Sequence, residues 1–279
     1  MLDRAAGGEQ YRLKRNRLAD IRLCRDSMGA DAMPRVRTAV RAAVVVGTAS
    51  LTVVVFLGSA WAGSLKSQAW VGYQAGGEKF QRVAASWKVP AVACAGVAAR
   101  GDSDSYVWVG LGSGASNSER VGVREFCTGT LQAYVAFVEM NNLYEVQGID
   151  PTPGDAVSAS VTYVSGKYRF SLFDSTQRKS FSLKYSCGAF SFGQGVCSRA
   201  TAEVGAGIWA RHLSPLADYG RVVFAGIAIT NARGRHGSFA RNRYWRIAKF
   251  SEFDGTRLAA FPSSLSHRGT RFTDTWRHL

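Results

Sequence analysis

The sequence predicts an all-β protein, a two-sheet antiparallel β-sandwich, placed after an N-terminal signal or anchor segment. Three observations carry this prediction. An uncharged run lies near the N-terminus, and the residues after position 62 alternate between apolar and polar with a period of two. No amphipathic helical pattern follows residue 62. Many short strands without helices bury their apolar faces best by packing two sheets together.

The N-terminal region predicts export. Residues 1–41 are polar and basic, and residues 42–57 read AAVVVGTASLTVVVFL, without a charge. Ala60-x-Ala62 then has the small-x-small pattern of a cleavage site, so we expect residues 42–62 to be a signal peptide. The alternative is an uncleaved membrane anchor, because this segment is about long enough to span a bilayer. Met33 is a second candidate start, in which case residues 1–32 are not translated.

The rest of the chain predicts one domain. Residues 63–69 are expected to be a short linker, and residues 70–279 a single β-sandwich. A hydrophobic content of 46% excludes wholesale disorder. The protein is therefore expected to be secreted, or held on the outer face of the cytoplasmic membrane if the anchor is retained.

Cysteine usage agrees with an oxidising compartment. After residue 62 the chain holds four cysteines, Cys94, Cys127, Cys187 and Cys197. The last two flank a Gly-rich loop, GAFSFGQGV, so we expect them to close a hairpin, which leaves Cys94 with Cys127. Buried free thiols are the alternative. No C-x-x-C pattern points to zinc or redox chemistry, and we expect no metal and no cofactor.

Several segments show the strand pattern clearly. In 156–164 the apolar residues occupy alternate positions, and Ser165-Gly166 then predicts a hairpin turn. The same alternation continues through 168–172 and 181–185. The run RVVFAGIAIT, residues 221–230, is more continuously apolar and predicts a central strand.

The familiar catalytic and polymer-binding motifs give little. The chain has no H-E-x-x-H, G-x-S-x-G or Walker sequence, and its four histidines lack metal-ligand spacing. The stretch RGRHGSFARNRYWR, residues 233–246, mixes arginines with aromatic residues as nucleic-acid grooves do. Export argues against a nucleic-acid partner. An anionic cell-surface polymer fits such a basic face better, and plain solvation of the arginines is the simplest interpretation.

Two carboxylates stand out because their neighbours are apolar. Glu139 lies in YVAFVEM, on the same strand face as Val135 and Phe137, and Glu203 lies in ATAEVGAGIW. A carboxylate on a buried face is costly unless it is paired, and such groups are candidate acids or bases. The alternative is that both occupy the solvent face of their strands.

Seven short motifs, in order, make the chain resemble the glutamic peptidases (eqolisins, the scytalidopepsin-like G1 family), especially their bacterial secreted members. The motifs are Trp70-Val71-Gly72-Tyr73; Ser86-Trp87-Lys88-Val89-Pro90 followed by Cys94; Trp108-Val109-Gly110-Leu111; Gly122 followed by Cys127; Tyr134-x-Ala136-Phe137-Val138-Glu139; Pro215-Leu216-Ala217-Asp218-Tyr219-Gly220; and Gly269-Thr270-Arg271-Phe272 before Trp276. The resemblance covers most of residues 70–276 and implies a concanavalin-like sandwich of the eqolisin type.

The resemblance also implies a catalytic pair. In the family a Glu acts as general base on a water, and a Gln amide holds that water and stabilises the oxyanion. The Glu corresponds to Glu203, and the Gln position holds Arg120 here. Val204 and Gly205 replace the family's Trp and Ile after the Glu, and Gly112 stands where fungal members often have Asp. Trp108 and Glu139, which line the substrate groove in the family, keep their residue types.

Arg120 decides between two functions. A guanidinium donates well to an oxyanion, but it has no acceptor for the attacking water and is expected to pair with Glu203. The family resemblance favours an exported glutamic-type endopeptidase homologue that binds a polypeptide as a monomer, whereas the arginine favours loss of activity. The alternative is an inactive pseudopeptidase that binds peptide or glycan at the cell surface.

Overall fold

The computed structural model describes residues 13–14, 64–94, 102–112, 118–140, 142–146, 148–186, 198–208, 215–240 and 243–277. The elements described below belong to one compact unit. The predicted signal segment 42–62 and the predicted pair Cys187 and Cys197 lie outside the described residues. Within those residues, no helix is long and apolar enough to cross a membrane.

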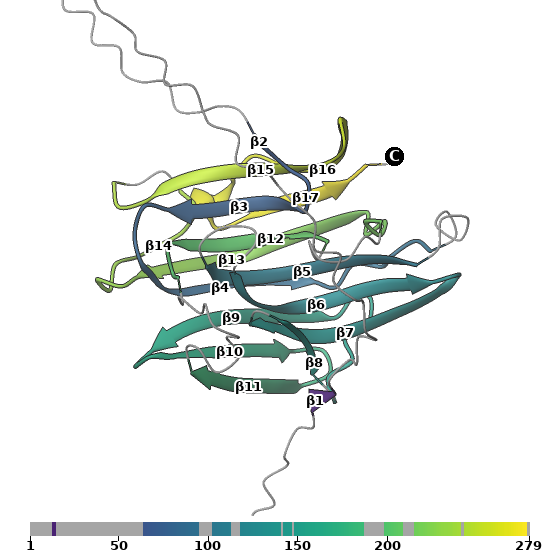
Figure 1. The fold of residues 1–279 in the computed structure, drawn as a ribbon, viewed down its shortest axis with the longest axis horizontal. Coiled ribbons are helices and arrows are strands. Elements are labelled where there is room, and N and C mark those ends of the chain that lie inside the picture. The colour runs from purple at the N-terminus through teal and green to yellow at the C-terminus, as the bar shows by residue number, and fades with distance from the viewer. Residues whose placement is uncertain are drawn as a thin grey trace, which may run out of the picture. The chain divides into compact units, whose positions relative to one another are not determined.

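One sheet, called here the first sheet, carries the candidate site. Its central strands follow one another in the order β8–β7–β6–β5–β12–β3–β15–β16–β17, and the neighbours in this order are antiparallel (Figure 1). Its strands are β1 (Leu13–Lys14), β2 (Leu65–Ser67), β3 (Trp70–Gly76), β5 (Ser103–Gly112), β6 (Ser118–Thr128), β7 (Leu131–Met140), β8 (Asn142–Val146), β12 (Thr201–Gly207), β15 (Arg246–Asp254), β16 (Arg257–Pro262) and β17 (Phe272–Trp276). Strand β2 pairs in parallel with β15.

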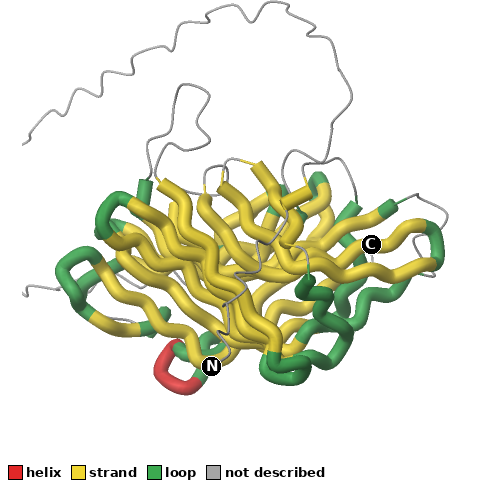
Figure 2. Tube along the Cα trace, turned by 90° about the horizontal axis from the view of Figure 1, so that it is seen from below, coloured by secondary structure: helices red, strands yellow, loops and turns green. Residues whose placement is uncertain are grey.

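The second sheet has the order β13–β4–β9–β10–β11. Its strands are β4 (Phe80–Lys88), β9 (Ala156–Val164), β10 (Lys167–Asp174), β11 (Lys179–Ser186), β13 (Arg221–Asn231) and the short β14 (His236–Gly237) beside β13. The two-sheet antiparallel sandwich predicted from the sequence is therefore confirmed. Figure 2 shows that strands dominate, and the one helical element in the described part of the chain is the 3-10 turn η1 (His267–Gly269).

Strand β13 belongs to both sheets. Its residues 221–224 pair with β17 of the first sheet, and its residues from Ala225 onward pair with β4 of the second. The register shifts between Ala225 and Ala228, where Gly226 has a φ of 61°. A bulge at this point bends the strand from one sheet into the other. The apolar run expected to form a central strand is thus the connection between the layers.

The core lies between the two sheets and follows the predicted alternation. Along β9, Val157, Ala159 and Val161 are buried, whereas Ser158 between them is exposed. Ser165 and Gly166 both have positive φ, as a tight hairpin turn between β9 and β10 requires. These positions confirm the period-two alternation and the hairpin turn predicted from the sequence.

Two segments have a different role from the one their sequences suggest. Residues 65–67, within the expected linker, form β2, so ordered structure begins before Trp70. In the basic stretch 233–246, Phe239 and Trp245 are buried, and the Trp245 indole N–H donates to the carbonyl of Ser238 at 3.1 Å. Those rings are core residues, so they are not a stacking platform for bases.

A disulfide joins Cys94 to Cys127. This is the pairing expected if Cys187 and Cys197 are bonded to each other. Cys94 follows β4 of the second sheet, and Cys127 lies near the end of β6 in the first. Both residues are buried, and the bond closes 33 residues of sequence. It therefore ties the two sheets together at the end of the strand that carries Arg120.

The buried carboxyl groups outside the predicted site include Glu119, Glu125, Glu252 and Asp274. Burial raises the pKa of Glu119 and of Glu252 to about 8. Burial also raises the pKa of Glu125 and of Asp274 well above the ordinary range, and for Asp274 the charge of Glu252 adds to this. An ionised carboxylate in an apolar interior is costly, so these groups favour the protonated form.

These buried groups predict that the fold is more stable in mild acid. A carboxyl whose pKa is higher in the folded state than its ordinary value of 4.5 binds its proton more tightly when folded. Lowering the pH from about 8 toward 4.5 should therefore raise the free energy of unfolding by roughly a few kcal/mol. Thermal melts at about pH 8.5 and about pH 5 measure this difference.

Glu252→Gln should remove part of that difference by raising the melting temperature mainly at the higher pH. Asp150→Asn, at an exposed position, is the matched control and should leave the difference intact. A wild-type protein that melts at a lower temperature at pH 5 than at pH 8.5 would contradict the prediction.

Candidate active site

A row of residues crosses the first sheet at one level. The register places Gln74 beside Glu203, Glu203 beside Gly110, Gly110 beside Arg120, and Arg120 beside Glu139. We call these five residues the polar row. Residues opposite one another in register share a face of the sheet, so the row projects to one side. That side, called here the site face, is opposite the main core.

Arg120 lies between two carboxylates. Its Nη1 is 3.4 Å from Oε2 of Glu139, and its Nη2 is 3.5 Å from Oε2 of Glu203. Gly110 stands on the strand between Arg120 and Glu203, and its lack of a side chain leaves room for the guanidinium to reach across β5. The guanidinium carbon also lies 4.4 Å from the ring centre of Trp108. This ring and the two carboxylates compensate a buried cation.

Glu203 is fully buried, and its two oxygens have different neighbours. Oε1 accepts a hydrogen bond from the Gln74 amide at 3.0 Å and another from the Thr201 hydroxyl at 3.0 Å. Oε2 faces Arg120. The two hydrogen bonds to Oε1 therefore orient the carboxylate so that Oε2 faces the Arg120 guanidinium.

Gln74 and Thr201 were not among the residues expected at the site from the sequence. The signal was present, because Trp70, Gly72 and Gln74 alternate along one strand face within an otherwise apolar segment. A polar side chain at such a position needs a partner across the sheet. The pattern alone does not say which strand provides it, since β3 and β12 are far apart in sequence.

An aromatic cluster lies next to the polar row. Trp70, Tyr106, Trp108 and Phe137 form a buried group separate from the main core, and Phe250 stacks on Trp70 with ring centres 4.6 Å apart. A Cβ atom at Gly205 would lie 2.1 Å from the carbonyl oxygen of Val71 and 3.1 Å from the Trp70 ring. Gly205 therefore allows close strand contact and makes room for that ring.

A second ion pair lies on the site face. Arg124 donates to Oδ1 of Asp104 from Nε at 3.2 Å and from Nη2 at 2.8 Å. The guanidinium carbon is also 4.5 Å from the ring centre of Phe126. Both arginines of β6 thus meet carboxylates and rings on the same side of the sheet.

Glu119, the neighbour of Arg120 in sequence, points the other way. It pairs in register with Leu111, which is buried in the main core, and burial raises its pKa to about 8. The alternation of β6 thus separates a protonated carboxyl inside the sandwich from a guanidinium on the site face.

The site face brings together Trp108, Arg120, Glu139 and Glu203. The model of the Peptidase A4 family matches residues 68–257 of this sequence. The chain belongs to the Peptidase A4 family.

Solved glutamic peptidases of this family share the fold. Scytalido-glutamic peptidase with a transition-state analog inhibitor has a TM-score of 0.61 at 20% identity, covering 76% of this chain and 99% of the other. SCP-B, an eqolisin in complex with the tripeptide Ala-Ile-His, has a TM-score of 0.58 at 20% identity with the same coverage. Aspergilloglutamic peptidase from Aspergillus niger has a TM-score of 0.53 at 18% identity, covering 63% and 99%. No curated protein sequence matches the chain.

No group of three metal-binding side chains occurs in the described parts of this Peptidase A4 member. What the polar row can do follows from its own groups. It holds two carboxylates, one guanidinium and one amide beside buried indole rings. These groups suit proton transfer and binding of a polar, partly negative group.

The contact between Gln74 and Glu203 predicts a pH-dependent stability change. Gln74→Glu keeps the shape but replaces the amide donor with a second carboxylate beside Glu203. At neutral pH the repulsion and the lost hydrogen bond should lower the free energy of unfolding by about 2–4 kcal/mol. At about pH 4 the loss should be smaller, because one carboxyl of the pair then takes up a proton.

Denaturant unfolding at both pH values measures this effect. Gln132→Glu, at an exposed position of β7, is the control and should change little at either pH. A Gln74→Glu loss that is equal at the two pH values would show that the amide does not act on the Glu203 charge.

Proposed function

We propose that this protein is an exported glutamic-type endopeptidase in which Glu203 is the general base and Arg120 takes the place of the family's glutamine. The observation that supports this most directly is that Glu203, Arg120 and Trp108 lie together on the site face of a Peptidase A4 family member. It places a base next to a cation on the strands that match the family. A polypeptide is the ligand expected on the same grounds, because solved neighbours are in complex with a peptide-based transition-state analog or a tripeptide.

The proposed reaction needs only these groups. A water between Glu203 and the peptide carbonyl gives its proton to the Glu203 carboxylate as its oxygen bonds to the carbonyl carbon. The negative charge that forms on the carbonyl oxygen is bound by Arg120 N–H groups. Glu203 then returns the proton to the amide nitrogen while the C–N bond breaks. The products are a carboxylic acid and an amine, and no redox partner is required.

The charge balance of the polar row favours acid conditions. With Glu139 and Glu203 both ionised, two negative charges share one guanidinium. A lower total negative charge around Arg120 in acid would free part of the Arg120 charge for the oxyanion. The stability of the fold in mild acid, expected from the buried carboxyls, is consistent with this working range.

The second candidate is a peptide-binding pseudopeptidase, and one observation favours it. Arg120 already contacts carboxylates on both sides, and a base held in an ion pair is less available to a water. Arginine also has no acceptor for a hydrogen bond from that water, in contrast to an amide. In this case the site face binds an extended peptide or glycan without cleaving it.

Activity measurements on three proteins distinguish the two functions. We expect the wild-type protein to cleave a denatured protein substrate between about pH 2 and pH 6, with new termini identified by mass spectrometry. Glu203→Gln should abolish cleavage, because the general base is lost. Arg120→Met, which keeps a long side chain without donors, should lower kcat by about 10²–10³-fold.

Arg120→Gln is the informative comparison. A wild-type protein that is inert while Arg120→Gln cleaves would establish the pseudopeptidase and refute the enzyme. Melting curves for every variant separate loss of fold from loss of chemistry. Arg257→Gln, at an exposed position on β16, is the matched control and should leave activity unchanged.

Export is part of this proposal and has its own test. We infer that residues 42–62 direct secretion, supported by their uncharged run and the Ala60-x-Ala62 pattern. Expression of the full chain in a secreting host should release a protein whose first residue is near Gly63. Non-reducing peptide mapping of that material should also recover Cys187 linked to Cys197. Protein that stays in the membrane fraction with residues 42–62 intact would show an anchor instead.

A further inference from the structure

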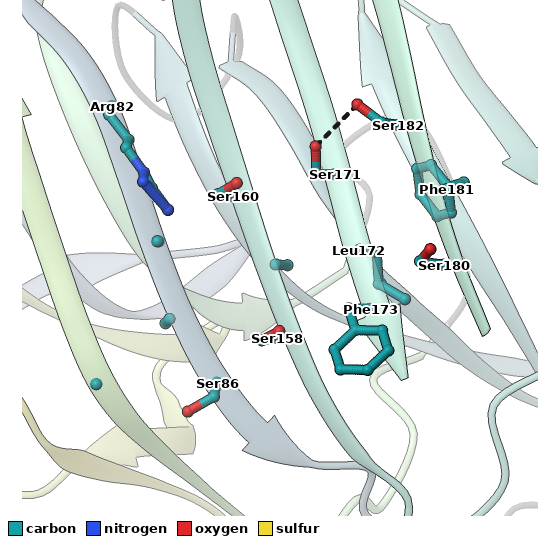
Figure 3. A pocket seen from close by; sticks show the side chains of 14 residues that line it. Arg82, Ser86, Ser158, Ser160, Ser171, Leu172, Phe173, Ser180, Phe181 and Ser182 are labelled. Carbon is teal, nitrogen blue, oxygen red and sulfur yellow. Dashed lines mark hydrogen bonds between the residues drawn. The ribbon is translucent and has the colours of Figure 1, made fainter. Parts of the chain in front are cut away.

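The second sheet has a hollow on its outer face, away from the polar row. Its volume is about 590 Å³, and it lies over β4, β9, β10 and β11, with Gly226 of β13 at one side (Figure 3). Six of its fourteen lining residues are serines. The serines are Ser86, Ser158, Ser160, Ser171, Ser180 and Ser182. Nothing in the proposed peptidase chemistry uses this face.

The hydroxyls form an ordered array because the strands are in register. Ser160, Ser171 and Ser182 stand side by side on β9, β10 and β11, and Ser86 lies beside Ser158 one level away. Ser171 and Ser182 share a hydrogen bond of 3.1 Å, and Ser86 donates to the carbonyl of Ala225 at 3.1 Å. Each hydroxyl has further donor or acceptor capacity, so the array can bind a ligand that itself carries many hydroxyls.

One exposed aromatic ring borders this array. Phe173 lies between Ser158 on β9 and Ser180 on β11, and 44% of its surface is exposed. A large apolar side chain at an open strand position is not explained by core packing, since its neighbours Leu172 and Asp174 point inward. A flat ring among hydroxyls provides an apolar surface for the carbon face of a sugar.

A basic row lies next to the hydroxyls. Arg82, Thr162, Arg169 and Lys184 are neighbours in register across β4, β9, β10 and β11. Lys88 and Lys167 occupy further outward positions, and no Asp or Glu occupies an outward position on the described lengths of these four strands. This face therefore has a positive potential that attracts a polyanion and depends on salt.

We propose that this face binds an acidic polysaccharide, a chain of sugar units that carry carboxylates. The sugar hydroxyls would contact the serine array, a sugar ring would stack on Phe173, and the carboxylates would meet Arg82, Arg169 and Lys184. Charge complementarity selects an anionic chain, and the hydroxyl array with one ring favours a sugar over a nucleic acid, which needs stacking surfaces for successive bases. The outer face of the second sheet would then attach the protein to polysaccharides of this kind.

The test measures binding of the full-length protein to polygalacturonate, with neutral dextran and single-stranded DNA as comparison polymers. Isothermal titration at low and at physiological salt gives the affinities. We expect binding to polygalacturonate that weakens with salt, and no binding to dextran. The double change Arg82→Ser with Arg169→Ser should weaken binding by about tenfold or more.

Phe173→Ser should also weaken binding, but without changing its dependence on salt, because the ring carries no charge. Arg221→Ser with Arg257→Ser removes the same charge at exposed positions outside the second-sheet hollow and should leave the affinity within about twofold. Melting curves show whether each variant remains folded.

Several outcomes would overturn the proposal. Absence of binding to polygalacturonate would do so, as would equal losses in the Arg82/Arg169 and Arg221/Arg257 variants. Tighter binding to DNA than to polygalacturonate would show that the face binds polyanions in general and does not prefer a sugar chain. Since the readout is binding, none of these outcomes depends on whether the polar row cleaves peptides.

Discussion

The burial of the Arg120 guanidinium is the constraint on which the candidate site depends. A permanent cation that is only 6% exposed requires compensation, and the structure supplies it from three directions with Glu139, Glu203 and the Trp108 ring. This compensation exists only if β7, β6, β5 and β12 keep one register, because a slip of one residue would turn each of these side chains to the opposite face. The close approach at Gly205 and at Gly122, where a Cβ would meet backbone atoms, holds the strands to that register.

The two faces of each sheet divide the chemistry of the protein. Between the sheets lie the apolar core and several buried carboxyl groups that favour protonation, such as Glu252 and Asp274. The site face of the first sheet carries aromatic rings with paired charges. The outer face of the second sheet carries hydroxyls and unbalanced positive charge. One alternating pattern therefore generates an interior whose carboxyl groups favour protonation, a candidate catalytic surface and a candidate binding surface.

The contacts of Glu203 are divided between its two carboxylate oxygens. The Gln74 amide and the Thr201 hydroxyl donate to Oε1, and the Arg120 guanidinium lies 3.5 Å from Oε2. The carboxylate therefore has hydrogen-bond donors on one oxygen and a cation on the other. This arrangement joins β3, β12 and β6, three strands that are distant in sequence.

The sequence by itself determined the all-β class, the strand positions around 156–185 and 221–230, and the family, because period-two alternation and ordered short motifs are local properties. It also brought Glu203, Arg120, Trp108 and Glu139 forward as candidates, through apolar neighbours and motif positions. The tertiary structure alone decided that Arg120 is shared between two carboxylates, that Gln74 and Thr201 orient Glu203, and that β13 joins both sheets. It also placed six serines and a basic row on one outer face. These facts depend on which strands become neighbours and in which register, and residues distant in sequence meet only when the sheets form.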